Sequence, residues 1–315
     1  MIETFYATLS PMLVMFLCMI IGFTAKKLGL SPDNTATVLS KLENYFFVPA
    51  LIINTFMKYC TVESISNGYK LIIYCLIALV IALIISISLS RLFTKDSYEI
   101  NIYKYALAFG NFSFMGNAIV PAILGDEALY NYMLYILPLN IAVYTWGIVI
   151  LIPKKSSEKN STLKSLINPI FISIILGAFI GLSGITKYIP SFISTTLSNC
   201  SACMGPLAMI LTGFVIGGYD IGKLLKNKKI YIATFLRLIV LPSLFIGILY
   251  LLGADFNTLV LTLFAFGTPL GLNTVVFPAA YGTDTSTGAS MAMISHTLCI
   301  ITIPIMFTLL TTLLA

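Results

Sequence analysis

The sequence predicts an all-α protein that crosses a membrane many times, and three observations predict it. The chain of 315 residues is 58% apolar and 10% charged, and its mean hydropathy is +0.98. A soluble domain carries roughly 25% charged residues, so this composition excludes a soluble enzyme, a nucleic-acid binder and a disordered chain. The apolar runs are too long and too continuous for the strands of a membrane barrel, which would alternate.

The apolar runs predict ten transmembrane helices, because a helix needs about 20 mostly apolar residues to cross a bilayer. The first run has no basic segment before it, which indicates a retained helix and not a cleaved leader. The expected spans are 5–24, 35–56, 68–92, 103–124, 128–152, 168–186, 194–218, 229–252, 258–280 and 287–312.

The Lys and Arg residues near the ends of the spans set the expected topology, because cytoplasmic loops carry an excess of them. One side of the membrane receives only Lys58, Lys70 and Lys187. The other side receives Lys26, Lys27, Arg91, Lys95, Lys104, Lys154, Lys155, Lys159, Lys164, Lys223, Lys226, Lys228 and Lys229. This distribution predicts a multi-pass protein of the plasma membrane with both termini outside the cell.

The two halves of the chain share features at a constant offset of 157 residues. The matching pairs are Phe109-Gly110 and Phe266-Gly267, Pro49 and Pro206, Pro121 and Pro278, and Gly125 and Gly282. Because each half holds five spans, the second half would insert upside down, as in the inverted repeats of secondary transporters. We expect one repeat at 1–152, a cytoplasmic linker at 153–167 and a second repeat at 168–315.

Spans four and nine contain both Gly and Pro, which a lipid-facing helix should not accumulate. Broken helices occur at membrane depth only inside protein or beside a water-filled cavity, and their N-terminal N–H groups can hold an anion. The alternative is that these residues only allow tight helix packing. The residues expected to bind substrate are Asn111, Gly116, Asn117, Pro121, Pro269, Asn273, Thr274 and Pro278.

These two segments resemble the crossover segments of the auxin efflux carrier family, which includes plant auxin exporters and bacterial permeases for malate and other carboxylates. The resemblance rests on residues 111–125 and 269–284. It extends over the whole chain, including Asn168-Pro169, Arg237 with Pro242, and Ile303-Pro304.

The resemblance implies a fold like that of bile-acid symporters and sodium–proton antiporters, with a scaffold and a transport domain each drawn from both repeats. It implies a secondary active transporter, a permease or efflux carrier, for a small organic anion, expected to be a carboxylate. Elevator-like alternating access would move the substrate at the crossing of spans four and nine. The expected partners are this anion and the lipid bilayer, with proton coupling and a homodimer left open and no nucleic acid. We expect no enzyme activity, metal or cofactor.

Three ionisable residues inside predicted spans are candidates for coupling or for pairing with the anion, because charge at membrane depth is costly and usually functional. Glu43 can carry a proton or pair with Lys41. Arg237 can face the anion, clamp two domains together or extend its charged end to the membrane surface. His296 is the only histidine, and it can exchange a proton or remain a buried neutral ring.

Two other functions stay open at this point. A sodium-coupled organic-anion symporter of the bile-acid type would use acidic groups near the crossover, and residues 258–280 contain none. An intramembrane hydrolase would use Ser183, which lies between Gly181 and Gly184, with His296 as its base. A serine near the end of one span and a histidine at mid-depth of another would lie too far apart for a hydrogen bond.

Overall fold

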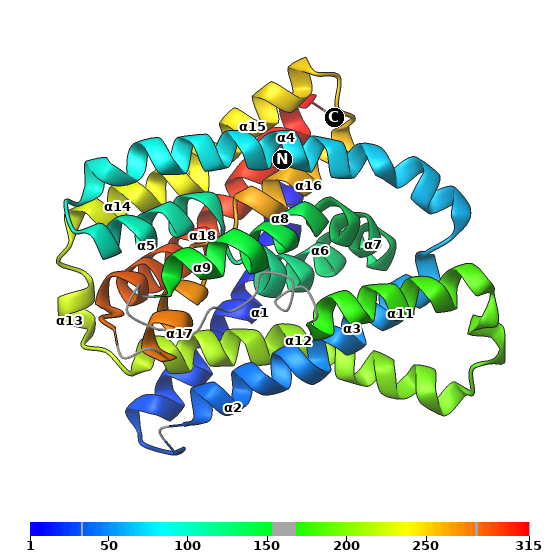
Figure 1. The fold of residues 1–315 in the computed structure, drawn as a ribbon, viewed down its shortest axis with the longest axis horizontal. Helices are drawn as coiled ribbons and strands as arrows, with labels where there is room; N and C mark the ends of the chain where they lie inside the picture. The colour runs from blue at the N-terminus through cyan, green and yellow to red at the C-terminus, as the bar shows by residue number, and fades with distance from the viewer. Residues whose placement is uncertain (33, 153–167, 281–282, 315) are drawn as a thin grey trace.

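A computed structural model describes residues 1–32, 34–152, 168–280 and 283–314 (Figure 1). All named secondary-structure elements of this part are helices, and an isolated antiparallel β-bridge joins Gly110 to Leu270. The all-α fold class predicted from the sequence is therefore confirmed. The predicted linker at 153–167 lies outside the described residues.

The described helices follow one another in an order that includes several short π-helical and 3₁₀ segments. They are α1 (Ile2–Lys27), α2 (Thr35–Leu42), η1 (Glu43–Phe47), α3 (Val48–Tyr59), α4 (Val62–Phe93), α5 (Ser97–Ala108), η2 (Phe112–Gly116), α6 (Asn117–Leu124), α7 (Asp126–Tyr135), α8 (Leu137–Ala142), η3 (Val143–Gly147), α9 (Ile148–Leu151), α11 (Pro169–Ser183), η4 (Ile185–Tyr188), α12 (Ser191–Gly217), α13 (Ile221–Leu224), α14 (Lys228–Phe235), η5 (Leu236–Val240), α15 (Leu241–Leu251), α16 (Phe256–Phe266), α17 (Asn273–Ala280) and α18 (Ser286–Leu314).

Six helices in the described part of the chain are long and apolar enough to cross a membrane. A bent pair, Asp126–Tyr135 with Leu137–Leu151, makes a seventh if it is counted as one span. The six are Ile2–Lys27, Thr35–Tyr59, Val62–Phe93, Ser191–Gly217, Lys228–Leu251 and Ser286–Leu314. The protein is therefore a polytopic membrane protein, and its arrangement as ten spans in two inverted repeats stays a prediction.

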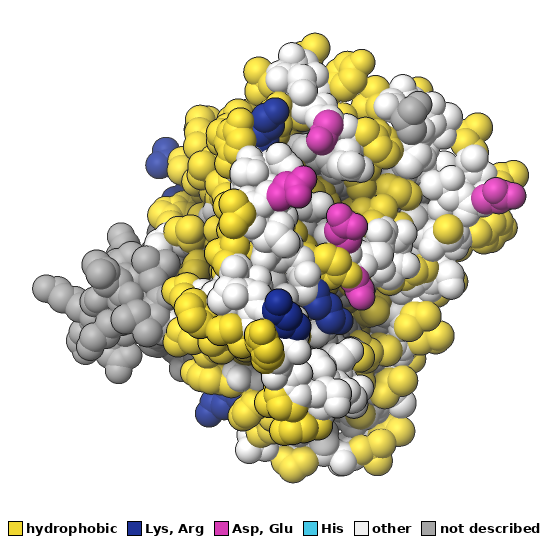
Figure 2. All heavy atoms as spheres, turned by 90° about the vertical axis from the view of Figure 1, so that its right-hand side faces the viewer, with side chains coloured by type: hydrophobic (Ala, Val, Ile, Leu, Met, Phe, Trp, Pro, Cys, Tyr) yellow, Lys and Arg dark blue, Asp and Glu magenta, His cyan; other side chains and the backbone are white. Residues whose placement is uncertain are grey.

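The outer surface of the helix bundle carries many apolar side chains. Leu17, Ile84 and Phe179 are 58%, 60% and 62% exposed. Figure 2 shows one face, on which apolar side chains surround the exposed charged groups. A soluble protein rarely exposes apolar surface on this scale, whereas lipid tails accept it.

Two pairs of helices that are distant in the sequence pack closely through glycine. α1 packs on α12, with Gly22 against the backbone of α12 and Gly213 against the backbone of α1. α11 packs on α3, where a Cβ on Gly177 would lie 2.8 Å from Cβ of Phe56. Small residues bring helices together in a membrane because packing, and not the exclusion of water, holds them there.

The predicted spans four and nine are both broken. α5 ends at Ala108 and η2 begins at Phe112, while α16 ends at Phe266 and α17 begins at Asn273. The residues between these ends are not helical. Each span is therefore divided into two half-helices that meet at a short extended segment.

Candidate functional site at the crossing of two broken helices

The two extended segments cross and satisfy one another's backbone groups. Gly110 and Leu270 form the antiparallel bridge, and the amide of Asn111 donates to the carbonyl of Pro269 at 2.6 Å. The amide of Leu270 donates to the hydroxyl of Ser295 on α18 at 3.0 Å. Because lipid offers no hydrogen bonds, these contacts allow unwound backbone to lie inside the protein.

Glycine is required where the crossing is tightest. A Cβ on Gly110 would lie 2.5 Å from a guanidinium nitrogen of Arg237 and 2.8 Å from the carbonyl oxygen of Thr268. Any side chain at this position would push the two segments apart. This close approach explains the Gly that the sequence places in the middle of span four.

A cavity of about 700 Å³, hereafter the large cavity, lies beside the crossing. The first residues of η2 and of α17 line it, and the first N–H groups of a helix lack partners within the helix and carry partial positive charge. The polar and charged residues on its lining are Lys26, Thr37, Ser40, Lys41, Asn44, Tyr45, Tyr105, Asn111, Ser113, Asn140, Tyr144, Asn168, Tyr219 and Asn273.

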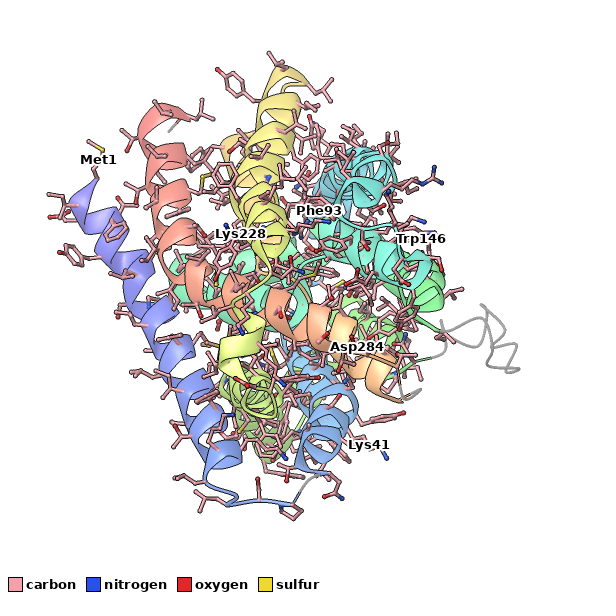
Figure 3. The ribbon with its side chains drawn as sticks, turned by 90° about the vertical axis from the view of Figure 1, so that its left-hand side faces the viewer. Met1, Lys41, Phe93, Trp146, Lys228 and Asp284 are labelled. Carbon is pink, nitrogen blue, oxygen red and sulfur yellow. The ribbon has the colours of Figure 1, made fainter. Side chains whose placement is uncertain are left out.

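The charges on the large cavity are of one sign. Its described lining includes Lys26 and Lys41 and contains no Asp or Glu. Lys41 lies on α2, near the lower end of α1 in Figure 3, and the ammonium of Lys26 lies 5.2 Å from the ring centre of Phe214. Two lysines and two helix N-termini make this cavity electropositive, so it favours an anion.

Buried side chains from other helices hold the two predicted asparagines on this lining. Nδ2 of Asn273 donates to the hydroxyl of Tyr105 at 2.7 Å. Nδ2 of Asn111 lies 3.0 Å from Nε2 of His296. Tyr105 and His296 are 1% and 2% exposed, so both carboxamides are positioned before any ligand arrives.

Asn117 and Pro121 lie apart from Asn111 and Asn273. They line a second cavity, hereafter the small cavity, of about 260 Å³, together with residues of α1, α3, α7 and α12. The structure thus divides the predicted substrate-binding residues between two cavities.

The two cavities lie toward opposite ends of the same helices. Residues 36–45 of the continuous helix Thr35–Tyr59 line the large cavity, and residues 51–59 line the small one. On α12, residues 211–215 line the large cavity and residues 198–206 the small one. The large cavity is therefore at the end of these helices that lies beside Lys26 and Lys41, whereas the small cavity is at the end beside Lys58.

Four predicted residues are absent from the described lining of both cavities. The hydroxyl of Thr274 donates to the carbonyl of Gly271 at 3.0 Å, which closes the first turn of α17. Gly116 packs against the hydroxyl of Tyr132. The four are Gly116, Pro269, Thr274 and Pro278.

Arg237 is fully buried and lies at the crossing. One of its terminal nitrogens is 3.3 Å from the carbonyl oxygen of Leu107 and 3.4 Å from that of Ala108, at the end of α5. Its guanidinium carbon is 5.8 Å from the ring centre of Phe266, at the end of α16. Arg237 thus places positive charge against the C-terminal ends of two half-helices, where the helix dipole is negative. Its charged end does not extend to the membrane surface.

Glu43 is also fully buried, and neither carboxyl oxygen has a hydrogen-bond partner within the described part of the chain. The ion pair with Lys41 that the sequence left open is therefore not formed. Lys41 and Asn44 line the large cavity, and Glu43 is not among the lining residues. A coupling role for Glu43 stays a prediction.

The pair of side chains that a hydrolase would need is not assembled. The hydroxyl of Ser183 donates to the carbonyl of Ile180 at 3.1 Å. The two ring nitrogens of His296 contact Asn111 and the carbonyl oxygen of Ala292. Ser183 is exposed and His296 is buried, so the geometry gives no support to a serine nucleophile.

Sequence reasoning did not assign Lys26, Tyr105 or Asn140 to the site. Asn140 is a carboxamide inside an apolar span, and that signal could have indicated it. Lys26 was read only as a topology marker, and Tyr105 is one of 17 tyrosines in the chain. Only the packing of separate helices brings these two side chains to the large cavity.

Broken helices that cross beside a cavity with polar side chains on its lining are typical of secondary transporters. A family model described as "Membrane transport protein" matches residues 7–307, and the chain belongs to this family, which is that of the auxin efflux carriers. The resemblance of the crossover segments is thereby confirmed. The chain is 24% identical over 299 residues to an uncharacterized transporter from Methanocaldococcus jannaschii, covering 92% of this chain and 95% of that protein.

We expect Arg237→Met to lower the melting temperature of the detergent-purified protein by several degrees. A hydrogen bond to a charged group contributes roughly 1.5–3 kcal/mol, and this change removes the charge from two buried carbonyl groups. The melting temperature of Arg237→Lys should fall by less, because lysine keeps the positive charge. Arg91→Met, at an exposed position near the end of α4, is the control. A melting temperature of Arg237→Met equal to that of wild type would contradict this structural role.

Proposed function

We propose that this protein is a secondary active transporter of a small organic anion, most simply a carboxylate. The observation that carries the proposal is the large cavity, where two helix N-termini, Asn111, Asn273 and two lysines converge without an acidic residue on the described lining. Neutral N–H donors and helix dipoles can hold a carboxylate without a buried ion pair. A volume of about 700 Å³ lies within the range of small-molecule sites.

We propose further that the chain forms ten spans in two inverted repeats. By the 157-residue offset, α1 corresponds to α11, and the helix containing α3 corresponds to α12. A two-fold relation between the repeats turns the contact of α1 with α12 into a contact of α11 with α3. Both contacts are present in the structure. An even number of spans returns both termini to one side, and the two ends lie close together in Figures 1 and 3.

The topology follows from the basic loops and is tested by labelling single cysteines in a cysteine-free background. With both termini outside, the loop 153–167 is cytoplasmic, so Ser157→Cys should resist an impermeant maleimide in intact cells. Tyr188→Cys, at a position that is 77% exposed, should react. Labelling at 157 together with protection at 188 would show the opposite orientation, with both termini inside the cell.

Elevator-like alternating access is supported by the position of the cavities. The large cavity lies between α1, α2 and α12 on one side and the crossing segments on the other. The small cavity lies between α1, α3 and α12 on one side and the second half of span four on the other. In this conformation the cavity beside Asn111 and Asn273 is the larger. Movement of the crossing segments along the scaffold helices would close it and enlarge the small cavity, where Asn117 and Pro121 lie.

A sodium-coupled symporter is the second candidate, and one observation favours it. Asn54 and Asn117 both line the small cavity, and each has a buried carboxamide oxygen with no hydrogen-bond partner in the described structure. Oxygen atoms near broken helices are the ligands that transporters offer to sodium.

A flux assay separates these candidates and tests the proposal. Proteoliposomes should take up at least one compound from a panel of radiolabelled mono- and dicarboxylates, saturably and without chemical change. Uptake should continue when choline replaces sodium at constant pH. Loss of flux in choline would establish the sodium symporter, and a panel in which no carboxylate moves would overturn the anion proposal.

Asn273→Ala should weaken binding of the transported carboxylate by roughly 10- to 150-fold, because a hydrogen bond to a charged group contributes about 1.5–3 kcal/mol. The melting temperature should fall as well, because the buried hydroxyl of Tyr105 loses the carboxamide that donates to it, so affinity is compared at a temperature where both proteins are folded. Asn117→Ala should reduce flux as well, if the small cavity is the other half of the route. Ser183→Ala is the matched control and should transport normally. Wild-type affinity in Asn273→Ala would place the site elsewhere.

A further inference from the structure

We propose that His296 and Asn111 form a proton-coupled switch beside the large cavity. Protonation of the imidazole reverses the carboxamide of Asn111, so that its NH₂ group faces the cavity in place of its oxygen. A proton and an organic anion then bind together. The inference rests on the proposed function, since it takes the anion of that proposal as the ligand.

The contacts of the ring fit a neutral imidazole in this conformation. Nδ1 of His296 lies 2.7 Å from the carbonyl oxygen of Ala292, which can only accept, so Nδ1 carries a hydrogen. Nε2 lies 3.0 Å from Nδ2 of Asn111, which can only donate, so Nε2 accepts. A ring with one donor and one acceptor nitrogen is neutral.

The ring also decides which end of Asn111 remains for the cavity. Asn111 lines the large cavity. One of the two hydrogens on its nitrogen is given to the neutral ring, so the oxygen and at most one N–H remain for a ligand. A carboxylate needs donors and is repelled by an oxygen. When Nε2 gains a proton, only the oxygen of Asn111 can accept from it. The carboxamide then turns over, and its NH₂ group becomes a donor for the anion. The exchange needs no extra volume because the two ends of a carboxamide are nearly equal in size.

The surroundings oppose a charged ring unless an anion is present. His296 is 2% exposed and borders a pocket of about 10 Å³ whose other lining residues are Met12, Met15, Phe16, Met19, Met115, Met209 and Ile300. An isolated charge is costly in such an apolar site. An anion in the adjacent large cavity would offset that cost.

The charged and titratable groups on the elements packed against α18 do not supply this anion. On α1 they are Glu3, Tyr6, Cys18, Lys26 and Lys27; on α5 they are Tyr98, Glu99, Tyr103, Lys104 and Tyr105. On α12, α13, α14 and η5 they are Cys200, Cys203, Lys223, Lys228, Lys229, Tyr231 and Arg237, with Cys299 on α18 itself and none on α16 or α17.

The two carboxylates of that set lie at helix ends. Glu3 is in the first turn of α1. Glu99 accepts from the hydroxyl of Thr287 at 2.6 Å, and Thr287 precedes His296 by nine residues, or about 13 Å of helix. The mid-depth cation is Arg237, which disfavours a second positive charge. A bound carboxylate is therefore the counter-charge that stabilises the imidazolium, and each of the two ligands strengthens the other by the same factor.

The test uses the fact that His296 is the only histidine of the chain. Protein labelled with ¹⁵N-histidine, and purified through a tag that contains no histidine, should show a neutral ring with hydrogen on Nδ1. Saturating L-malate, or the carboxylate that the flux panel selects, should convert the ring to imidazolium at pH 6–7. Binding measured with the radiolabelled compound should strengthen as pH falls, by up to about tenfold per unit for one coupled proton.

The variants distinguish the switch from other sources of pH dependence. His296→Gln can accept from Asn111 but cannot become charged, so its binding should be weaker and independent of pH. Asn111→Ala should keep the neutral ring and bind weakly. Glu43→Gln removes the other buried titratable group near the cavity and should retain the imidazolium signal. Loss of pH dependence in Glu43→Gln with retention in His296→Gln would assign coupling to Glu43 and overturn the proposal.

Failure of the switch is distinguishable from failure of the proposed function. If the carboxylate binds while the ring stays neutral and affinity does not change with pH, the switch is wrong and the anion transporter stands. If no carboxylate binds or moves, the anion site itself is wrong, and the switch fails with it.

Discussion

The pairing of two unwound backbone segments at the crossing is the constraint on which the rest of the structure depends. A break in a membrane helix releases N–H and C=O groups that lipid cannot satisfy, and each unsatisfied group costs several kcal/mol. The bridge between Gly110 and Leu270, and the bond from Asn111 to Pro269, return these groups to partners. Neither break would be tolerated by itself in lipid, so spans four and nine must lie against each other.

The crossing also gives the negative and the positive ends of the half-helices different surroundings. The first half-helices, α5 and α16, end against Arg237, which supplies positive charge to their negative ends. The second halves begin beside the large cavity, where no protein anion of the described lining occupies their N–H groups. The buried cation Arg237 is thus engaged with backbone, and the cavity is left with neutral N–H donors and with Lys26 and Lys41. This division is what the proposed anion site requires.

The fold class and the positions of both breaks could be predicted from the sequence, because apolar length and the placement of Gly and Pro are local properties. The end of α11 at Gly184, which has a positive φ, and the bend between α7 and α8 beside Pro138 also have local signals, which the prediction of uninterrupted spans did not use. In the site, Asn111 and Asn273 come together at the large cavity as the crossover motifs implied. Asn117 follows Asn111 by only six residues, yet it lies past η2 and lines the other cavity. The contact between Asn111 and His296 joins residues 185 apart, and no local pattern reports it.

The methionine-lined pocket has an electrical consequence. Met15 borders both this pocket and the small cavity, while His296 borders the pocket and holds Asn111 on the large cavity. The apolar side chains around this pocket thus form a layer between the two cavities. Water and ions in both cavities would confine most of the membrane voltage to that layer, and moving one charge through it involves about 2.3 kcal/mol per 100 mV. A lone anion would be driven outward by a negative cell interior, whereas a singly charged anion accompanied by one proton would cross this layer without responding to the voltage.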